Sequence, residues 1–337
     1  MRAAGLDYES RALDERDLPE PRGAGAGEAL LRVREVGICG TDRELATFSI
    51  GFPPEGESFL VLGHEALAQV VEAGPGVKAL KPGDWVVPLV RRPCNPPCFS
   101  CARGRRDLCL TGKALERGIF GLHGYFAEYA VDSEADLVRV PEALLDTAVL
   151  IEPLSVVEKA VETALRIHEP GARTALVFGA GPIGLLAAMV LELRGLRAAI
   201  VSLEPPDHPR ARLVAAAGIE YLNTPGERKA DIVIEAAGAA DAAMAGLRSL
   251  APLGVLGVLG SPDARGEIPF RDMLVKNQTV FGSVNASPEA FQRALEDLPR
   301  MDAGVLKRMI HRASFGDFAT TIPAAAGGAA KVVHVIE

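Results

Sequence analysis

Four of the five cysteines fall within sixteen residues, spaced as Cys94-x3-Cys98-x2-Cys101-x7-Cys109 on a loop rich in proline and glycine. Four thiolates this close together match the tetrahedral coordination of Zn²⁺. A site with four protein ligands leaves no position for a substrate. We therefore expect a structural zinc site that stiffens the loop. Free buried thiols are the alternative, but they do not account for such crowding.

A second group of residues has the spacing of a phosphate-binding loop. A G-x-G-x-x-G sequence directly follows the apolar run 174–178 and opens a helical segment. In this setting the glycines permit a tight turn, close approach of a pyrophosphate and close helix–strand packing. A glycine-rich turn in a sheet that binds nothing is the alternative. The predicted cofactor-binding residues are Gly179, Gly181, Pro182, Ile183 and Gly184.

Glu204 stands twenty residues beyond Gly184, at the end of the next apolar run. A carboxylate there can accept hydrogen bonds from the adenosine ribose and would repel a 2′-phosphate, so we expect NAD to be preferred. NADP stays possible, because Arg210 or Arg212 could fold back over Glu204 and Ser202 could donate to a phosphate. A surface glutamate without this role is the alternative.

The elements that must position these residues change character along the chain. Up to about residue 150, short apolar runs such as 29–36, 66–74 and 84–90 alternate with glycine and proline, which predicts an all-β domain. From about residue 172 a strand–helix pattern predicts a doubly wound parallel sheet in an α/β domain. Its expected strands are 174–178, 198–203, 231–235, 254–259 and 279–281, with a helix at 183–196.

The length of 337 residues favours two domains at about 150 residues each. We expect a first domain at 1–155, completed by 304–337, and a Rossmann dinucleotide-binding domain at 156–303. A helix at 153–167 would join them. After an alanine- and glycine-rich stretch at 324–330, a last strand at 331–336 would return to the first domain.

The composition excludes several classes of protein. Apolar residues make up 48% and charged residues 24%, as in folded globular proteins, and 36 basic against 44 acidic residues give a net charge of −8. This balance argues against nucleic acid as a partner. Because no run approaches about 18 apolar residues and the N-terminus lacks a signal sequence, we expect no membrane contact and a cytoplasmic location.

Further motifs occur in a characteristic order. They are Gly37-Ile38-Cys39-Gly40-Thr41-Asp42 and Gly63-His64-Glu65, followed by the four-cysteine loop and the glycine-rich loop. Over its whole length the chain thereby resembles the zinc-dependent medium-chain alcohol dehydrogenases. Segments 90–93, 116–119, 121–129, 152–154, 158–159 and 282–285 are most similar to the archaeal-type glucose 1-dehydrogenases within that family.

The resemblance implies a GroES-like β-barrel as the first domain. It also implies functional roles that could not be assigned to the residues one at a time. Taken alone, Cys39 and His64 are ordinary core residues and Glu152 an ordinary helix start. By resemblance these three are the ligands of a catalytic zinc, and Glu65 is an alternate ligand that exchanges with water. Thr41 then matches the hydroxyl that relays the substrate proton. By the same resemblance Glu116 binds sugar hydroxyls, and Asn285 lies near nicotinamide and substrate.

The chain departs from the family pattern at three points. One residue more than usual separates Cys94 from Cys98, so the loop must bulge or Cys94 coordinates poorly. Val156 stands where several glucose dehydrogenases have an acidic residue that contacts substrate. Ser202 and Leu203 stand where NADP-using relatives have arginines.

These observations together predict a zinc-dependent dehydrogenase that transfers a hydride from C1 of an aldose, glucose first, to NAD(P). The resemblance also implies a homo-oligomer, a tetramer or a dimer. Two alternatives stay open: a polyol or secondary-alcohol dehydrogenase of the sorbitol or threonine type, and a catalytically silent nucleotide-binding relative. The sugar interpretation predicts that Glu116 faces the metal site, whereas a solvent-facing Glu116 would favour another alcohol.

Overall fold

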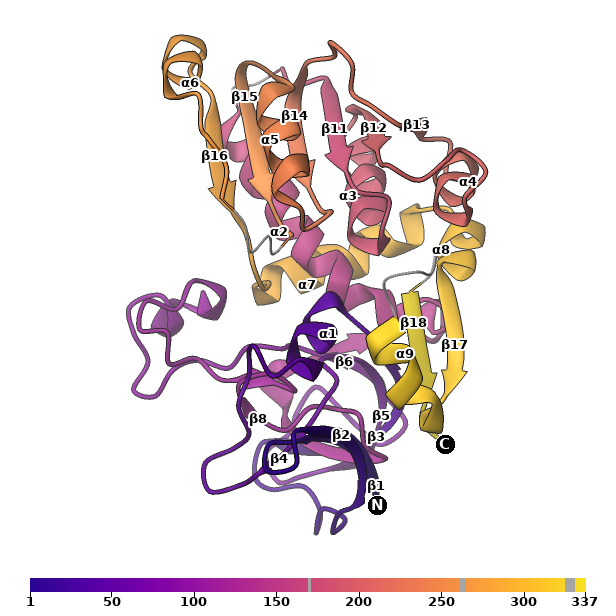
Figure 1. The fold of residues 1–337 in the computed structure, drawn as a ribbon. Helices are drawn as coiled ribbons and strands as arrows, with labels where there is room; N and C mark the ends of the chain where they lie inside the picture. The colour runs from indigo at the N-terminus through magenta and orange to yellow at the C-terminus, as the bar shows by residue number, and fades with distance from the viewer. Residues whose placement is uncertain (169–170, 261–264, 325–330) are drawn as a thin grey trace.

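The computed structural model describes residues 1–168, 171–260, 265–324 and 331–337. Two lobes are visible in Figure 1: one contains the N-terminal strands together with the last strands of the chain, and the other contains the middle of the chain. Of the expected loop region 324–330, residues 325–330 lie outside the described residues. No helix among the described residues is long and apolar enough to span a membrane.

The N-terminal lobe is built mainly from antiparallel strands. Its largest sheet has the order β10-β6-β5-β3-β18-β17, with β9 also paired to β3, and a smaller sheet has the order β2-β1-β4. The N-terminal strands are β1 (Arg2–Asp7), β2 (Ala12–Asp17), β3 (Glu28–Gly37), β4 (Phe59–Val61), β5 (Glu65–Ala73), β6 (Trp85–Pro88), β7 (Glu116–Arg117), β8 (Gly121–Leu122), β9 (Tyr129–Ser133) and β10 (Leu137–Val140). Buried and partly exposed residues alternate along much of β3, as expected for a strand with one face on a core.

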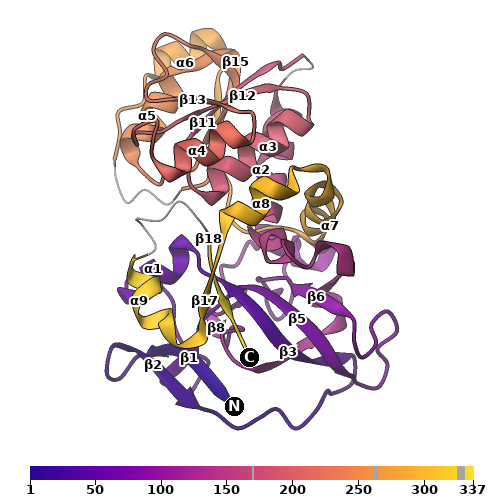
Figure 2. The same cartoon turned by 90° about the vertical axis from the view of Figure 1, so that its right-hand side faces the viewer.

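The chain returns to this lobe at its C-terminus. The strand β18 (Lys331–Val335) pairs antiparallel with β3, with Val333 opposite Gly37, and parallel with β17 (Ile310–Ser314). Figure 2 shows both strands beside the N-terminal sheet. The predicted return of the last strand is confirmed.

The second lobe contains the predicted parallel sheet. Its order is β13-β12-β11-β14-β15-β16, and every neighbouring pair is parallel. Its strands are β11 (Thr174–Phe178), β12 (Arg197–Val201), β13 (Glu220–Leu222), β14 (Ala230–Glu235), β15 (Leu250–Val258) and β16 (Thr279–Gly282). Four of the five residues of β11 are buried, because helices cover a central parallel strand on both faces.

The described helices are α1 (Gly40–Ala46), α2 (Ile151–Ile167), α3 (Pro182–Leu193), α4 (Pro209–Ala216), α5 (Ala240–Arg248), α6 (Phe270–Lys276), α7 (Pro288–Asp297), α8 (Ala303–Met309) and α9 (Phe318–Ala324). The predicted connecting helix is α2, which contacts β5 and β6 of the first lobe and α3, α7 and β15 of the second. Most of its residues are therefore buried.

Two predicted elements end earlier than expected. The helix predicted to reach residue 196 stops at Leu193, because Gly195 turns the chain with a φ of +84°. The strand predicted to reach residue 203 stops at Val201. The freed residues 202–204 form the loop that presents Glu204.

Candidate active site

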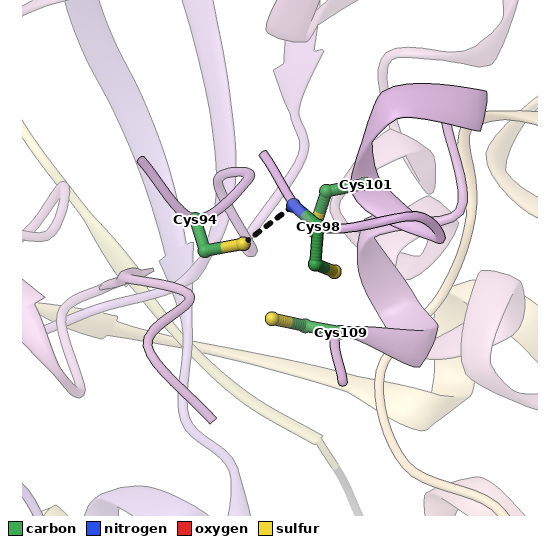
Figure 3. Close-up of side chains that lie close together, drawn as sticks. All are labelled: Cys94, Cys98, Cys101 and Cys109. Atoms are coloured by element: carbon green, nitrogen blue, oxygen red, sulfur yellow. Dashed lines mark hydrogen bonds between the residues drawn. The ribbon is translucent and has the colours of Figure 1, made fainter. Parts of the chain in front are cut away.

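The four clustered cysteines converge as the sequence predicts (Figure 3). Their sulfur atoms all lie within 4.8 Å of one another, including that of Cys94. The extra residue before Cys98 is accommodated, and the Cys98 N–H donates to the Cys94 sulfur over 3.2 Å. Burial and the neighbouring sulfurs raise the pKa of Cys101 to about 12. Since four thiolates cannot share this space without a cation, the cluster fits a closed zinc site.

A second cluster is buried where β3 leads into α1 and where β5 begins. Cys39 precedes α1, His64 precedes β5, and Glu65 is the first residue of β5, where it is the register partner of Gly37 at the end of β3. Ligand atoms of Cys39, His64 and Glu65 lie within 4.8 Å of one another. The structure thus groups Glu65, rather than Glu152, with the other two.

Glu152 lies beside this cluster in the first turn of α2 and is buried. Burial and the negative charge of Glu65 raise the pKa of Glu152 to about 8, whereas His64 opposes that shift. Its predicted role as a zinc ligand stays a prediction.

Two charged residues that sequence reasoning did not assign complete this site. The ammonium of Lys331 pairs with both oxygens of Glu65, and the Asp42 carboxylate accepts the Cys39 N–H over 2.7 Å. A Cβ atom on Gly37 would lie 2.4 Å from the Glu65 carboxylate, so a side chain there would displace that carboxylate. The sequence feature that could have indicated Lys331 is a lysine at the first position of a mostly apolar strand.

The charges of this pocket fit a divalent cation. His64 Nδ1 and Asp42 Oδ1 are buried 3.6 Å apart, too far for a hydrogen bond, and neither has a hydrogen-bond partner among the described residues. Burial opposes protonation of His64, but Asp42, Cys39 and Glu152 together outweigh it and raise the His64 pKa. Buried groups that can carry negative charge outnumber the positive ones, and a metal ion would restore the balance.

Thr41 lies in the first turn of α1, with its hydroxyl 3.8 Å from the Cys39 sulfur. The structure therefore brings the predicted proton-relay hydroxyl to the edge of the metal cluster.

The two predicted substrate-binding residues meet across the lobes. The amide of Asn285 donates to Glu116 Oε2 over 3.1 Å, and Arg91 donates to Glu116 Oε1 over 2.9 and 2.6 Å. Glu116 is only 5% exposed, so it does not face solvent. Two residues further on, a Cβ on Gly118 would lie 2.7 Å from the Gly63 carbonyl oxygen, which places this turn against the residue that precedes His64.

The glycine-rich loop has the geometry of a dinucleotide site. Gly179 has a φ of +111°, and Gly181 directly precedes α3, with Pro182 as the first helical residue. A Cβ on Gly184 would lie 1.9 Å from the Gly179 carbonyl oxygen, whereas a Cβ on Gly181 would meet nothing within 4 Å. The space above Gly181, in front of the helix N-terminus, is therefore open to a pyrophosphate.

Glu204 lies beyond the end of β12, where it is partnered. Ser202 donates to one carboxylate oxygen, and Arg210 pairs with the other over 2.7 Å. These two donors outweigh burial and lower the Glu204 pKa. Of the two arginines considered, Arg210 folds back over Glu204 and brings its guanidinium against that carboxylate.

Comparisons with known proteins identify the family of this chain. The family described as alcohol dehydrogenase GroES-like domain matches residues 25–142, and the family described as glucose dehydrogenase C-terminus matches residues 145–333. The chain belongs to the zinc-dependent medium-chain alcohol dehydrogenases, in the glucose dehydrogenase branch. The predicted fold class, a Rossmann sheet with a GroES-like barrel, is confirmed.

Individual relatives cover almost the whole chain. A glucose 1-dehydrogenase of Thermoproteus tenax is 46% identical over 313 residues, which are 88% of this chain and 87% of the relative. A glucose 1-dehydrogenase of Methanocella arvoryzae is 41% identical over 317 residues, 88% of both chains. The Haloferax mediterranei glucose dehydrogenase, solved with NADP, Zn and gluconolactone, superposes with a TM-score of 0.90 at 31% identity and covers 100% of this chain and 99% of that chain.

Proposed function

We propose that this chain is a zinc-dependent glucose 1-dehydrogenase that oxidises the C1 hydroxyl of glucose to the lactone and reduces NAD(P). The observation that carries the proposal is the buried Glu116, which is held by Asn285 and Arg91 and belongs to the turn that packs against Gly63. A buried carboxylate and amide at a substrate site suit a ligand with many hydroxyls, because each hydroxyl loses water and needs a new partner. A simple alcohol needs no such pair.

Each residue of the site is assigned a separate part in the reaction. Cys39 and His64, with Glu65 or Glu152, would hold the catalytic zinc, which when bound polarises the C1 hydroxyl and lowers its pKa. Thr41 takes the hydroxyl proton and passes it toward water. Glu116 and Asn285 orient the ring so that the hydride on C1 faces the nicotinamide C4. Lys331 pairs with the Glu65 carboxylate, and the open loop at Gly181 binds the pyrophosphate.

A sugar panel tests the proposal directly. Zinc-loaded protein is assayed at 340 nm with glucose, galactose, sorbitol and threonine, and each substrate is tested with both cofactors. We expect the highest kcat/KM with an aldose. Faster turnover of sorbitol or threonine would favour the polyol or secondary-alcohol alternative, and no turnover with any of them would favour the silent relative.

For the cofactor, we propose that NAD is preferred and NADP is also used. Glu204 at the end of β12 supports NAD, whereas its pairing with Arg210 supports binding of the 2′-phosphate. Replacing Arg210 with methionine should therefore lower kcat/KM for NADP far more than for NAD. Equal losses with the two cofactors would show that Arg210 does not meet the phosphate.

We propose the same division of domains as the sequence suggests, 1–155 with 304–337 and 156–303. The pairing of β18 with β3 supports it. The boundary falls inside α2, whose first turn carries Glu152 to the metal site. Because the five cysteines form no disulfide among the described residues and four of them are grouped for metal, we also propose a reducing, cytoplasmic location.

We infer that the protein is a homo-oligomer, a dimer or a tetramer, formed through the β16 edge of the parallel sheet. β16 is the last strand in the sheet order, and α6 precedes it. Large apolar side chains are exposed on these elements, namely Phe270, Leu274, Val275 and Val280. An exposed apolar edge strand is a natural pairing surface for a second copy.

A further inference from the structure

Polar contacts beside the candidate substrate site close into a ring that joins the two lobes. Arg91 binds the Glu116 carboxylate and also donates to the Asp107 carbonyl oxygen over 3.0 Å. Asn285 donates to Glu116 from the other lobe. Lys159 closes the ring: its ammonium lies 3.0 Å from Asp107 Oδ2 and donates to the carbonyl oxygen of Val284 over 2.8 Å. No role assigned so far requires Lys159.

The buried ammonium of Lys159 needs both of its partners, Asp107 and the Val284 carbonyl group. Its side chain is 10% exposed, and the side chain of Asp107 is fully buried. Burial lowers the pKa of Lys159, although the Asp107 carboxylate opposes this shift. A buried ammonium is unfavourable unless its protons are accepted, so the contacts to Asp107 and Val284 fix the position of the lysine and of the backbone that it binds.

On one side, the ring ends in the four-cysteine loop. Asp107 lies in a short 3₁₀ turn, residues 106–108, directly before Cys109, and its carboxylate is also bound by Arg105 over 3.0 Å. The neighbouring Arg106 pairs with Asp136 of the barrel. Consecutive residues of this turn therefore tie the cysteine loop to the barrel through Asp136 and to α2 through Lys159.

On the other side, the ring ends at the substrate residue. Asn285 has a φ of +61°, in the left-handed region that asparagine enters more readily than most residues with a side chain. Lys159 binds the carbonyl group of the preceding residue, Val284. Without that contact, the peptide between Val284 and Asn285 is free to relax, and the Asn285 amide would leave Glu116.

We propose that Lys159 is a positioning residue for substrate binding. Through its contact with Asp107, it links the conformation of the four-cysteine loop to the position of the Glu116–Asn285 pair. This inference rests on the proposed glucose dehydrogenase function and deepens it. It gives the four-cysteine site an effect on sugar affinity in addition to stability, although no cysteine of that site touches the substrate pair.

The test compares Lys159→Met with Lys159→Arg, which keeps a donor and a positive charge. The control is Lys307→Met, which removes an exposed lysine paired with Asp146 far from the ring. We expect Lys159→Met to raise the KM for glucose about tenfold, with a smaller fall in kcat. Lys159→Arg should restore most of the affinity, and the control should change neither constant. Zinc content should be unchanged in all three variants.

A binding measurement gives a second readout that does not depend on turnover. Gluconolactone is titrated into the complex of enzyme and oxidised cofactor, a pair that cannot react, and binding is followed by calorimetry. Its Kd should rise about as much as the KM in Lys159→Met. If that variant does not fold, Asp107→Asn, which leaves the shape of the ring intact, should produce the same rise in Kd.

The outcomes separate this inference from the function on which it rests. If the wild type does not oxidise glucose, the proposed function fails, and the sugar role of Lys159 fails with it. If the wild type oxidises glucose and Lys159→Met keeps the wild-type KM and Kd, only the positioning role is overturned. A fall in kcat at unchanged KM would also overturn it.

Discussion

At the scale of single residues, charge balance explains the candidate metal site. Glu65 and Glu152 are both buried, the negative charge of Glu65 raises the pKa of Glu152, and Lys331 is the cation that pairs with Glu65. A metal ion would share this role when bound. Both the Lys331 ammonium and a bound metal ion should therefore stabilise the pocket. Removing either should lower the stability most when the other is absent.

Replacing Lys331 with methionine tests this balance. Removing one partner of a buried ion pair costs about 3–5 kcal/mol, so metal-free protein should lose stability on that scale. Zinc-loaded protein should lose less, because the ion still compensates Glu65. Urea unfolding of both forms measures the difference, with Lys331→Arg as the matched control. An equal loss with and without zinc would show that Lys331 does not share this role with the metal.

Among the secondary-structure elements, the turn from β11 to α3 contains one glycine expected to matter for cofactor binding, Gly181, and one expected to matter for stability, Gly184. Gly181→Ala adds a methyl group where the protein has nothing within 4 Å, so the fold should keep its thermal midpoint while the dinucleotide Kd rises at least tenfold. Gly184→Ala should instead lower the midpoint strongly, because its Cβ would lie 1.9 Å from a carbonyl oxygen. Calorimetry and cofactor titration distinguish the two. Tight cofactor binding by Gly181→Ala would place the pyrophosphate elsewhere.

Helix α2 carries a carboxylate whose protonation should affect stability. Burial and the neighbouring Asp297 raise the pKa of Glu158 to about 7, even though Arg194 lies 2.7 Å away. The native state thus binds a proton that the unfolded chain releases near pH 4.5, so this contribution to stability is present at low pH and is lost as the pH rises through about 7.

Glu158→Gln, which resembles the protonated side chain, should remove that pH dependence. Between pH 5.5 and pH 7.5, wild-type protein should lose more unfolding free energy than the variant. Urea unfolding at the two values measures this. Parallel losses in the two proteins would show that Glu158 is ionised across this range.

How far the sequence predicts these elements depends on the range of the interactions. The strand before the glycine-rich loop, β11, follows from a local apolar pattern and has the predicted bounds, whereas β12 ends two residues before its predicted end. The Lys159 contacts join residues that stand 52 and 125 positions apart. Lys331 meets Glu65 only because β18 returns beside β3. Such long-range contacts produce no periodic pattern in the sequence, so they are seen only in the folded structure.

At the scale of the whole molecule, the proposed pairing of copies through the β16 edge predicts a defined change in mass. Leu274→Asp places a charge in the exposed apolar set of α6 and should shift the protein toward a smaller species. Light scattering after gel filtration measures the mass. Lys276→Asp, on the same helix but outside that apolar set, is the control. An unchanged mass for Leu274→Asp would remove this edge from the interface.

The two lobes together are proposed to remove a hydride from C1 of glucose. To test this, zinc-loaded enzyme and cofactor are incubated with glucose labelled with deuterium at C1, and the reduced cofactor is isolated for NMR. The deuterium should appear at C4 of the nicotinamide, in equal amount to the lactone formed. Reduced cofactor without deuterium, or no reduction of the cofactor at all, would contradict it.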